Sequence, residues 1–181
     1  MARSQTIAAS EIHDAIDRLA GLLAARHAGT SKLLLLGVAN GGIILARRLA
    51  EKLDRARSGV IDISFHRDDI ERHPVPKEFA PTHIPVDVHG ATVILVDDVL
   101  FSGRTVKAAL DELFDHGRPT KVELAVLVDR GGRRLPVAAD YVGLHLTATG
   151  QQKVKVLLDA DDPRQDVIRI DAQQRAGADA K

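Results

Sequence analysis

Residues 93–105 read Val-Ile-Leu-Val-Asp-Asp-Val-Leu-Phe-Ser-Gly-Arg-Thr (VILVDDVLFSGRT). The apolar run predicts a buried strand at 92–96, and the polar residues after it predict a turn at 97–103. Helical spacing resumes from about Arg104. In an open parallel sheet, ligands bind beyond the carboxyl ends of the strands. Because Asp97 and Asp98 stand at such an end, this stretch predicts both a buried strand and a candidate binding site.

The turn after the two carboxylates has the composition of a phosphate cradle. Ser102, Gly103, Arg104 and Thr105 open a helix, where unpaired N–H groups and the positive end of the helix dipole favour an anion. Gly103 permits close approach of the backbone, and the two hydroxyl groups add donors. Neither the triphosphate-binding Gly-x-x-x-x-Gly-Lys-Ser/Thr motif nor the dinucleotide-binding Gly-x-Gly-x-x-Gly motif occurs. In the alternative interpretation, one carboxylate caps the turn and the other is solvated.

The rest of the chain alternates between strand and helix patterns. Ile61, Ile63 and Phe65 alternate with polar residues and predict a half-exposed strand. The other predicted strands are 33–36, 122–128, 154–158 and 167–170. The predicted helices are one with Ile12, Ile16, Leu19 and Leu23 on its apolar face, one at 43–53, and one from about Arg104 that ends before Gly117. Ser10 is the candidate N-cap of the first helix. This order predicts an α/β fold, in which a mainly parallel central sheet carries helices on both faces.

Composition excludes several classes of function. The 25 basic residues equal the 25 acidic ones, so no global field favours a nucleic acid or a membrane. Cysteine is absent, which excludes disulfides and thiolate chemistry. No apolar run approaches the length of a membrane span, and the first ten residues lack an apolar signal core. We therefore expect a single cytoplasmic domain that covers residues 1–181.

The VILVDDVLFSGRT stretch closely resembles the phosphoribosyl pyrophosphate (PRPP) signature of type I phosphoribosyltransferases. The flanking segments IDISFHRDD, ELAVLVDRGGRRLPVAADYVG and KVKVLL resemble the PyrR family, whose members regulate pyrimidine operons and are also uracil phosphoribosyltransferases. The resemblance spans roughly residues 7–170. It implies a type I phosphoribosyltransferase fold with a flexible lid at about 68–86 and a small hood. The hood would comprise about 130–160 plus N-terminal residues, and 172–181 would be a frayed tail.

The resemblance also implies an activity and a site. Uracil and PRPP would give UMP and pyrophosphate, with Mg²⁺ bound through PRPP and without a direct protein ligand. Asp97 and Asp98 would contact the ribose hydroxyls, and Arg67 would be a third catalytic residue at the start of the lid. The 5′-phosphate would lie on Val99, Leu100, Phe101, Ser102, Gly103, Arg104 and Thr105. The pyrophosphate loop would be Ala39, Asn40, Gly41 and Gly42. The base and hood residues would be Arg130, Tyr141, Val142, Gly143 and Val154.

One position departs from the family pattern. Members usually carry a basic residue in the pyrophosphate loop, where this chain has Ala39. Arg67 is the nearest candidate to supply the missing charge. Arg133 and Arg134 fit either a site role or a solvated surface equally well.

Two other functions remain open. The first is an RNA-binding attenuator that senses UMP or PRPP, because regulatory relatives bind RNA through basic residues on the first helix. Here Asp14 and Asp17 stand on that helix, which disfavours RNA, although His13, Arg18, Arg26 and His27 remain. The second is a phosphoribosyltransferase for another base, or one with little activity because of Ala39. The resemblance further implies a homodimer or a higher homo-oligomer.

Overall fold

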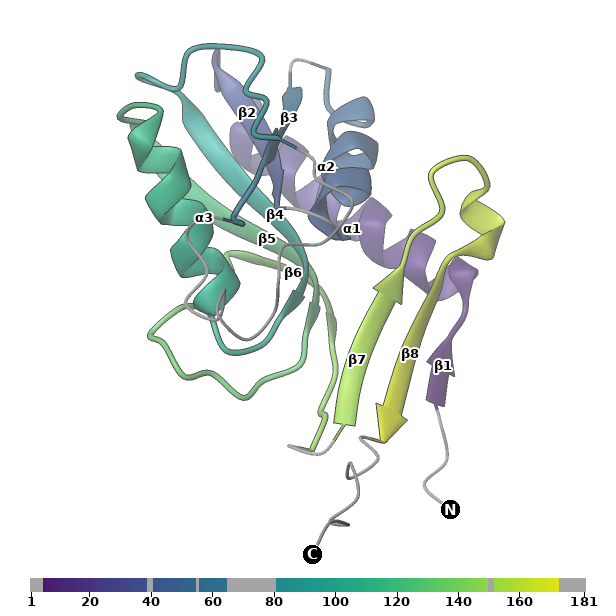
Figure 1. Cartoon of the computed structure of the whole chain (residues 1–181). Helices are drawn as coiled ribbons and strands as arrows, with labels where there is room; N and C mark the ends of the chain where they lie inside the picture. The colour runs from purple at the N-terminus through teal and green to yellow at the C-terminus, as the bar shows by residue number, and fades with distance from the viewer. Residues whose placement is uncertain (1–4, 39–40, 55, 65–80, 150–151, 173–181) are drawn as a thin grey trace, which may run out of the picture.

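A five-stranded sheet forms the centre of the computed structural model, which describes residues 5–38, 41–54, 56–64, 81–149 and 152–172. All neighbouring strands of this sheet run parallel, in the order β3-β2-β4-β5-β6 (Figure 1). The strands are β2 (Leu33–Val38), β3 (Arg57–Ile61), β4 (Thr92–Leu100), β5 (Lys121–Asp129) and β6 (Tyr141–His145). The predicted α/β fold class is confirmed.

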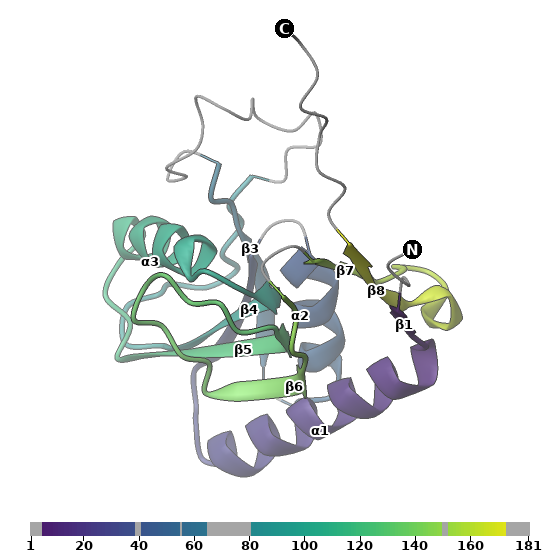
Figure 2. The same cartoon turned by 90° about the horizontal axis from the view of Figure 1, so that it is seen from below.

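Helices cover both faces of this sheet. Helices α1 (Ala9–His27) and α2 (Gly41–Glu51) lie on one face, and α3 (Arg104–Asp115) lies on the other (Figure 2). Alternate residues of each strand supply the two cores: Ile94 packs under α1 and α2, whereas Leu95 packs under α3. Continuous apolar runs mark these strands because both of their faces are buried. Within the described residues, no helix is both long enough and apolar enough to span a membrane.

A second, antiparallel sheet lies beside the α1–α2 face (Figure 1). It contains β1 (Gln5–Ile7), β8 (Val167–Ala172) and β7 (Gln152–Leu157) in that order, with a short 3₁₀ helix, η1 (Pro163–Gln165), before β8. Its apolar residues Ile7, Val154 and Ile168 join the core under α1. The range expected for the hood, about 130–160, contains β7 of this sheet, but the sheet extends to residue 172. β6 also lies in that range and belongs instead to the central sheet. The rest of the expected tail, 173–181, lies outside the described residues.

Two local predictions are wrong. Helix α1 begins at Ala9 with Ala8 at the N-cap position and no capping hydrogen bond from a side chain, so Ser10 is inside the helix. The strand predicted from Ile61 onward is β3, which ends at Ile61. Asp62 is buried rather than exposed because it accepts hydrogen bonds from the backbone N–H and the hydroxyl of Ser64. The local bonding of Asp62 therefore outweighs the alternation of the sequence.

The strand that carries the two carboxylates is also longer than predicted. β4 continues to Leu100, since Asp97 pairs with Val126 and Leu100 pairs with Asp129 of β5. Asp97 and Asp98 are thus strand residues, and the turn is confined to 101–103. Hydrogen bonding to the neighbouring strand fixes the backbone of both acids.

A buried polar cluster lies near the opposite end of the sheet. Glu123, at the start of β5, is 2% exposed. Its carboxylate accepts a hydrogen bond from the Tyr141 hydroxyl at 2.7 Å and lies 2.8 Å from Nε2 of His27. It also pairs with Lys121 at 2.5 Å and Arg26 at 2.9 Å. Burial alone raises the pKa of Glu123, but these partners outweigh it and hold the pKa at about 2.

Replacing Glu123 by Gln is therefore expected to lower the free energy of unfolding at pH 7 by roughly 2–3 kcal/mol. The folded-state pKa lies below the ordinary value of 4.5. The loss should accordingly be complete above about pH 4.5 and should shrink as the pH falls toward 2. Urea unfolding at a series of pH values measures the difference. The matched control Glu51→Gln alters an exposed carboxylate and should change little; a pH-independent loss in Glu123→Gln would contradict the prediction.

Candidate functional site

Two adjacent carboxylates at the end of β4 form the centre of the candidate site. Asp97 is 5% exposed, and Asp98 is partly buried. They lie where the regular alternation of β4 breaks, since Val96 and Val99 both pack in the core under α1 and α2. The backbone N–H of Asp98 donates to Oδ1 of Asp97 at 3.0 Å. Burial raises the pKa of Asp97, and the adjacent Asp98 charge raises it further; burial also raises the pKa of Asp98. Within the described residues neither acid has a cationic partner, so the pair is suited to a ligand that brings positive charge.

The start of α2 packs directly against these acids. A Cβ atom on Gly41 would lie 2.1 Å from Oδ2 of Asp98, and one on Gly42 would lie 2.1 Å from the carbonyl oxygen of Val96. A Cβ on Gly37 would lie 2.6 Å from Cα of Ile43. Only glycine permits this approach. The structure therefore brings Gly41 and Gly42 of the expected pyrophosphate loop to Asp98; Ala39 and Asn40 lie outside the described residues.

The expected phosphate cradle follows β4 on the other side. Gly103 has a φ of +90°, which favours glycine, and it is the N-cap residue of α3. The Ser102 hydroxyl accepts a hydrogen bond from the backbone N–H of Arg104 at 3.3 Å. Thr105 lies in the first turn of α3. By contrast, Val99 and Leu100 are residues of β4 whose side chains pack in the cores. The cradle geometry is thus confined to residues 101–105.

A stacked arginine stands beside this cradle. The guanidinium of Arg130 lies 4.1 Å from the centroid of the Phe101 ring, and Arg130 is 8% exposed. Arg133 is not simply solvated, since its side chain donates to the carbonyl oxygens of Leu100 and Phe101 and pairs with Asp129 at 2.5 Å. It holds the loop together. Phe101 and Arg130 lie far apart in the sequence, so no local pattern predicts their contact, although each is a candidate site residue by itself.

The remaining predicted base residues lie apart from this cluster. Tyr141 points into the Glu123 cluster, and the Gly143 carbonyl accepts a hydrogen bond from Arg18 at 3.1 Å. Val142 packs against the core under α3, and Val154 is buried in β7. Any contact of 141–143 or Val154 with a base would therefore come from the backbone, not from these side chains.

The expected lid is described only at its end. Arg67 and residues 68–80 lie outside the described residues. Residues 81–86 run beside β3, where the backbone N–H of His83 donates to Val60 at 2.9 Å and that of Val60 donates to His83 at 2.8 Å. This part of the expected lid is fixed to the sheet edge.

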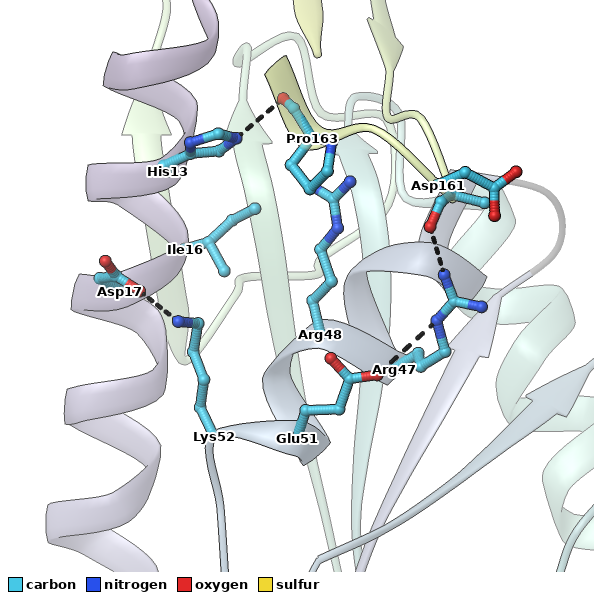
Figure 3. A pocket seen from close by; sticks show the side chains of 10 residues that line it. His13, Ile16, Asp17, Arg47, Arg48, Glu51, Lys52, Asp161 and Pro163 are labelled. Atoms are coloured by element: carbon cyan, nitrogen blue, oxygen red, sulfur yellow. Dashed lines mark hydrogen bonds and ion pairs between the residues drawn. The ribbon is translucent and has the colours of Figure 1, made fainter. Parts of the chain in front are cut away.

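A cavity of about 610 Å³ lies away from the carboxylates, between α1, α2 and the loop before β8 (Figure 3). Its charged side chains pair with one another: Lys52 contacts Asp17 at 2.8 Å, and Arg48 contacts the buried Asp166 at 2.5 Å. Arg47 donates to the Ala160 carbonyl at 3.0 Å. These pairs join α1 and α2 to the second sheet and give the cavity no net preference for a charged ligand.

The donor set fits the expected Mg²⁺ only as an ion that arrives with PRPP. No group of three or more His, Cys, Asp or Glu side chains among the described residues could hold a metal by itself. Asp97 and Asp98 offer carboxylate oxygens beside the ligand position, and Mg²⁺ commonly uses one or two carboxylates together with substrate phosphates.

The close approach of Gly41 to Asp98 gives a testable prediction. In Gly41→Ala the new methyl group would displace the Asp98 carboxylate, which can rotate away because it is the end of a side chain. We expect the affinity for PRPP to fall at least about tenfold, while the free energy of unfolding changes by less than about 1 kcal/mol. Calorimetric titration and urea unfolding measure the two quantities. Gly21→Ala, in open space on α1, is the control; unchanged PRPP affinity in Gly41→Ala would contradict the prediction.

Comparison with known proteins agrees with this geometry. Residues 8–158 match the phosphoribosyl transferase domain family. The Bifunctional protein PyrR of Streptomyces coelicolor is 48% identical over 164 residues, which cover 87% of this chain and 84% of that protein. The protein of the same name from Roseiflexus sp. is 43% identical over 176 residues, with coverage of 94% and 96%. The hypoxanthine phosphoribosyltransferase of Trypanosoma cruzi shares the fold, with a TM-score of 0.66 at 22% identity and coverage of 91% and 94%. The chain therefore belongs to the PyrR family of type I phosphoribosyltransferases.

Proposed function

We propose that the protein is a uracil phosphoribosyltransferase of the PyrR type, which converts uracil and PRPP to UMP and pyrophosphate. The observation that carries this proposal is the arrangement at the end of β4. Two adjacent carboxylates, the buried Asp97 and the partly buried Asp98, lie there between the glycine-packed start of α2 and the cradle at the start of α3. Membership of the PyrR family supports uracil as the base, whereas the solved purine enzymes support the fold alone.

The carboxylates act on the ribose in this proposal. Asp97 and Asp98 accept hydrogen bonds from its 2′- and 3′-hydroxyl groups. As the bond from C1′ to the pyrophosphate oxygen breaks, positive charge develops on the ribose, and buried carboxylates stabilise that charge most in the transition state. The bond between N1 of uracil and C1′ forms as the electron pair of the broken bond leaves with pyrophosphate.

The two helix starts hold the phosphates. Backbone N–H groups of 101–105 bind the 5′-phosphate, and those of 39–42 bind the pyrophosphate. Bound Mg²⁺ would supply positive charge to the leaving pyrophosphate. Arg67 adds the charge that Ala39 lacks, and closure of the part of the expected lid that precedes residue 81 excludes water from the activated sugar. A cytoplasmic homodimer or higher homo-oligomer belongs to the same proposal.

Product formation from labelled PRPP and Mg²⁺ tests the activity. Uracil, hypoxanthine, guanine, adenine and orotate are offered separately, and we expect UMP to form with a kcat/KM at least about 100-fold above that for any other base. The Asp97→Asn/Asp98→Asn double variant serves as the inactive control because it removes the charge that faces the ribose. Turnover with a purine or with orotate in place of uracil would overturn the choice of base.

RNA binding is the second candidate function, and the word "bifunctional" in the relatives' name favours it. The cations on α1 argue against that helix as the RNA surface. Arg26 and His27 contact Glu123, His13 contacts Asp166 at 3.1 Å, and Arg18 donates to the Gly143 carbonyl. Each is thus engaged within the protein, and Asp14 and Asp17 add negative charge to the helix.

We therefore expect weak RNA binding that does not depend on UMP. Filter binding with a pyrimidine-operon leader RNA, with and without UMP, measures it, and a scrambled RNA of equal length is the control. Weak binding of this kind comes chiefly from Lys and Arg contacts to phosphates, which do not depend on the base sequence. The affinity for the two RNAs should therefore be similar and should fall steeply with salt. Tight binding that UMP strengthens, and that the scrambled RNA does not show, would reverse this expectation.

A further inference from the structure

Arg130 is a buried cation without a carboxylate partner among the described residues. Its side chain is largely enclosed, with 8% of the residue exposed. Its Nε atom has no hydrogen-bond partner there, and one terminal nitrogen donates to the Thr149 carbonyl at the long distance of 3.4 Å. A buried charge without a partner is costly. The contrast with the buried Arg48, which pairs with Asp166 at 2.5 Å, shows how such a side chain is ordinarily satisfied.

The surroundings hold Arg130 in place without neutralising it. The Phe101 ring lies against the guanidinium at 4.1 Å, and a Cβ on Gly132 would lie 2.6 Å from that ring. The backbone N–H of Arg130 donates to the Leu100 carbonyl at 3.2 Å. The preceding carboxylate, Asp129, is paired with Arg133, and His145 is its partner in β6. Phe101 and the loop therefore orient the cation and leave its charge for a ligand.

The strand order decides which part of the ligand Arg130 meets. The pyrophosphate is assigned to the start of α2, which follows β2 on one side of β4. Arg130 follows β5, on the other side of β4. The ribose and 5′-phosphate are assigned to the end of β4 and the start of α3. The base is the remaining part of the substrates, and it falls on the side of β5, where Arg130 and Phe101 meet.

We propose, resting on the uracil transferase activity proposed above, that Arg130 is a catalytic residue that stabilises the N1-deprotonated form of uracil. Bound uracil first loses its N1 proton to water. The resulting N1 electron pair then forms the bond to C1′ as the C1′–oxygen bond breaks and its electron pair leaves with pyrophosphate. The negative charge of the uracil anion is shared with its ring carbonyl oxygens. A planar guanidinium can donate to such an oxygen, and in a buried site it favours the anion strongly.

Steady-state kinetics with two bases tests this role. In 5-fluorouracil the fluorine makes the ring N–H more acidic, so this base needs less help to ionise. We expect Arg130→Met to lower kcat/KM about 100-fold for uracil but only about tenfold for 5-fluorouracil. Arg130→Lys, which keeps a charge, should fall between. The matched control is Arg118→Met, which removes an arginine stacked on Phe114 at 5.4 Å on the exposed end of α3 and should leave both bases unchanged.

Two kinetic outcomes would overturn the proposal. Equal losses for uracil and 5-fluorouracil would make Arg130 a structural residue. A rise confined to the KM for PRPP would make it a phosphate contact. Thermal unfolding of Arg130→Met accompanies the kinetics, because unfolding would lower both kcat/KM values together.

Absorbance of the bound base supplies a readout that needs no turnover. The chain has no Trp and one Tyr, so the longer-wavelength band of ionised uracil is readable in the complex. The enzyme is saturated with uracil, ribose 5-phosphate and magnesium pyrophosphate and titrated with base. The pKa of bound uracil should be at least about one unit lower in wild type than in Arg130→Met. An equal pKa of bound uracil in wild type and Arg130→Met would refute the role of Arg130 and leave the transferase activity standing. A wild-type protein that binds and converts no uracil would refute both.

Discussion

The contact between the start of α2 and the end of β4 is the constraint on which the site depends. A side-chain carbon on Gly42 would lie 2.1 Å from the Val96 carbonyl, so the backbone of α2 touches the backbone of β4. Gly41 places the same helix start against Asp98. Parallel pairing of Gly37 with Val96 brings the end of β2 to the level of the two carboxylates. The distance between the α2 amides and the carboxylates is therefore fixed by main-chain packing rather than by adjustable side chains, and such fixed geometry favours catalysis.

Much of this arrangement could be predicted from the sequence, because the strongest local signals belong to the buried strands. Leu33–Leu36 and Val122–Val128 are continuous apolar runs, and their strands are buried on both faces. The position of the phosphate cradle also follows from local features, since Gly103 and the start of α3 are consecutive. The end of β4 could not be predicted, because polar residues ordinarily end a strand. Here pairing with β5 carries the strand through Asp97 and Asp98.

The parts that sequence reasoning missed depend on distant partners. β1 has three residues and exists through its pairing with β8, more than 150 positions later in the chain. β6 contains Gly143, and its neighbour Leu127 leaves no room for a side-chain carbon there. The Phe101–Arg130 stack likewise joins two loops. Local periodicity carries no information about such contacts, so two strands and the contact between Phe101 and Arg130 emerge only in three dimensions.

The two buried acids Glu123 and Asp97 have opposite environments, one suited to stability and the other to ligand binding. Glu123 has several cationic and hydroxyl partners, which hold its pKa at about 2 and make its charge part of the folded core. Asp97 has no such partner among the described residues, and burial raises its pKa. Arg130, which directly follows β5, is the corresponding buried cation without a carboxylate partner among the described residues. If Asp97 and Arg130 paired with each other, each would be stabilised and neither would meet a substrate. Asp97 lies in β4 and Arg130 follows β5, so in the proposed reaction they act on different parts of one ligand, the ribose and the base. The cost of these charges in folding free energy is offset by the Glu123 cluster and the two cores.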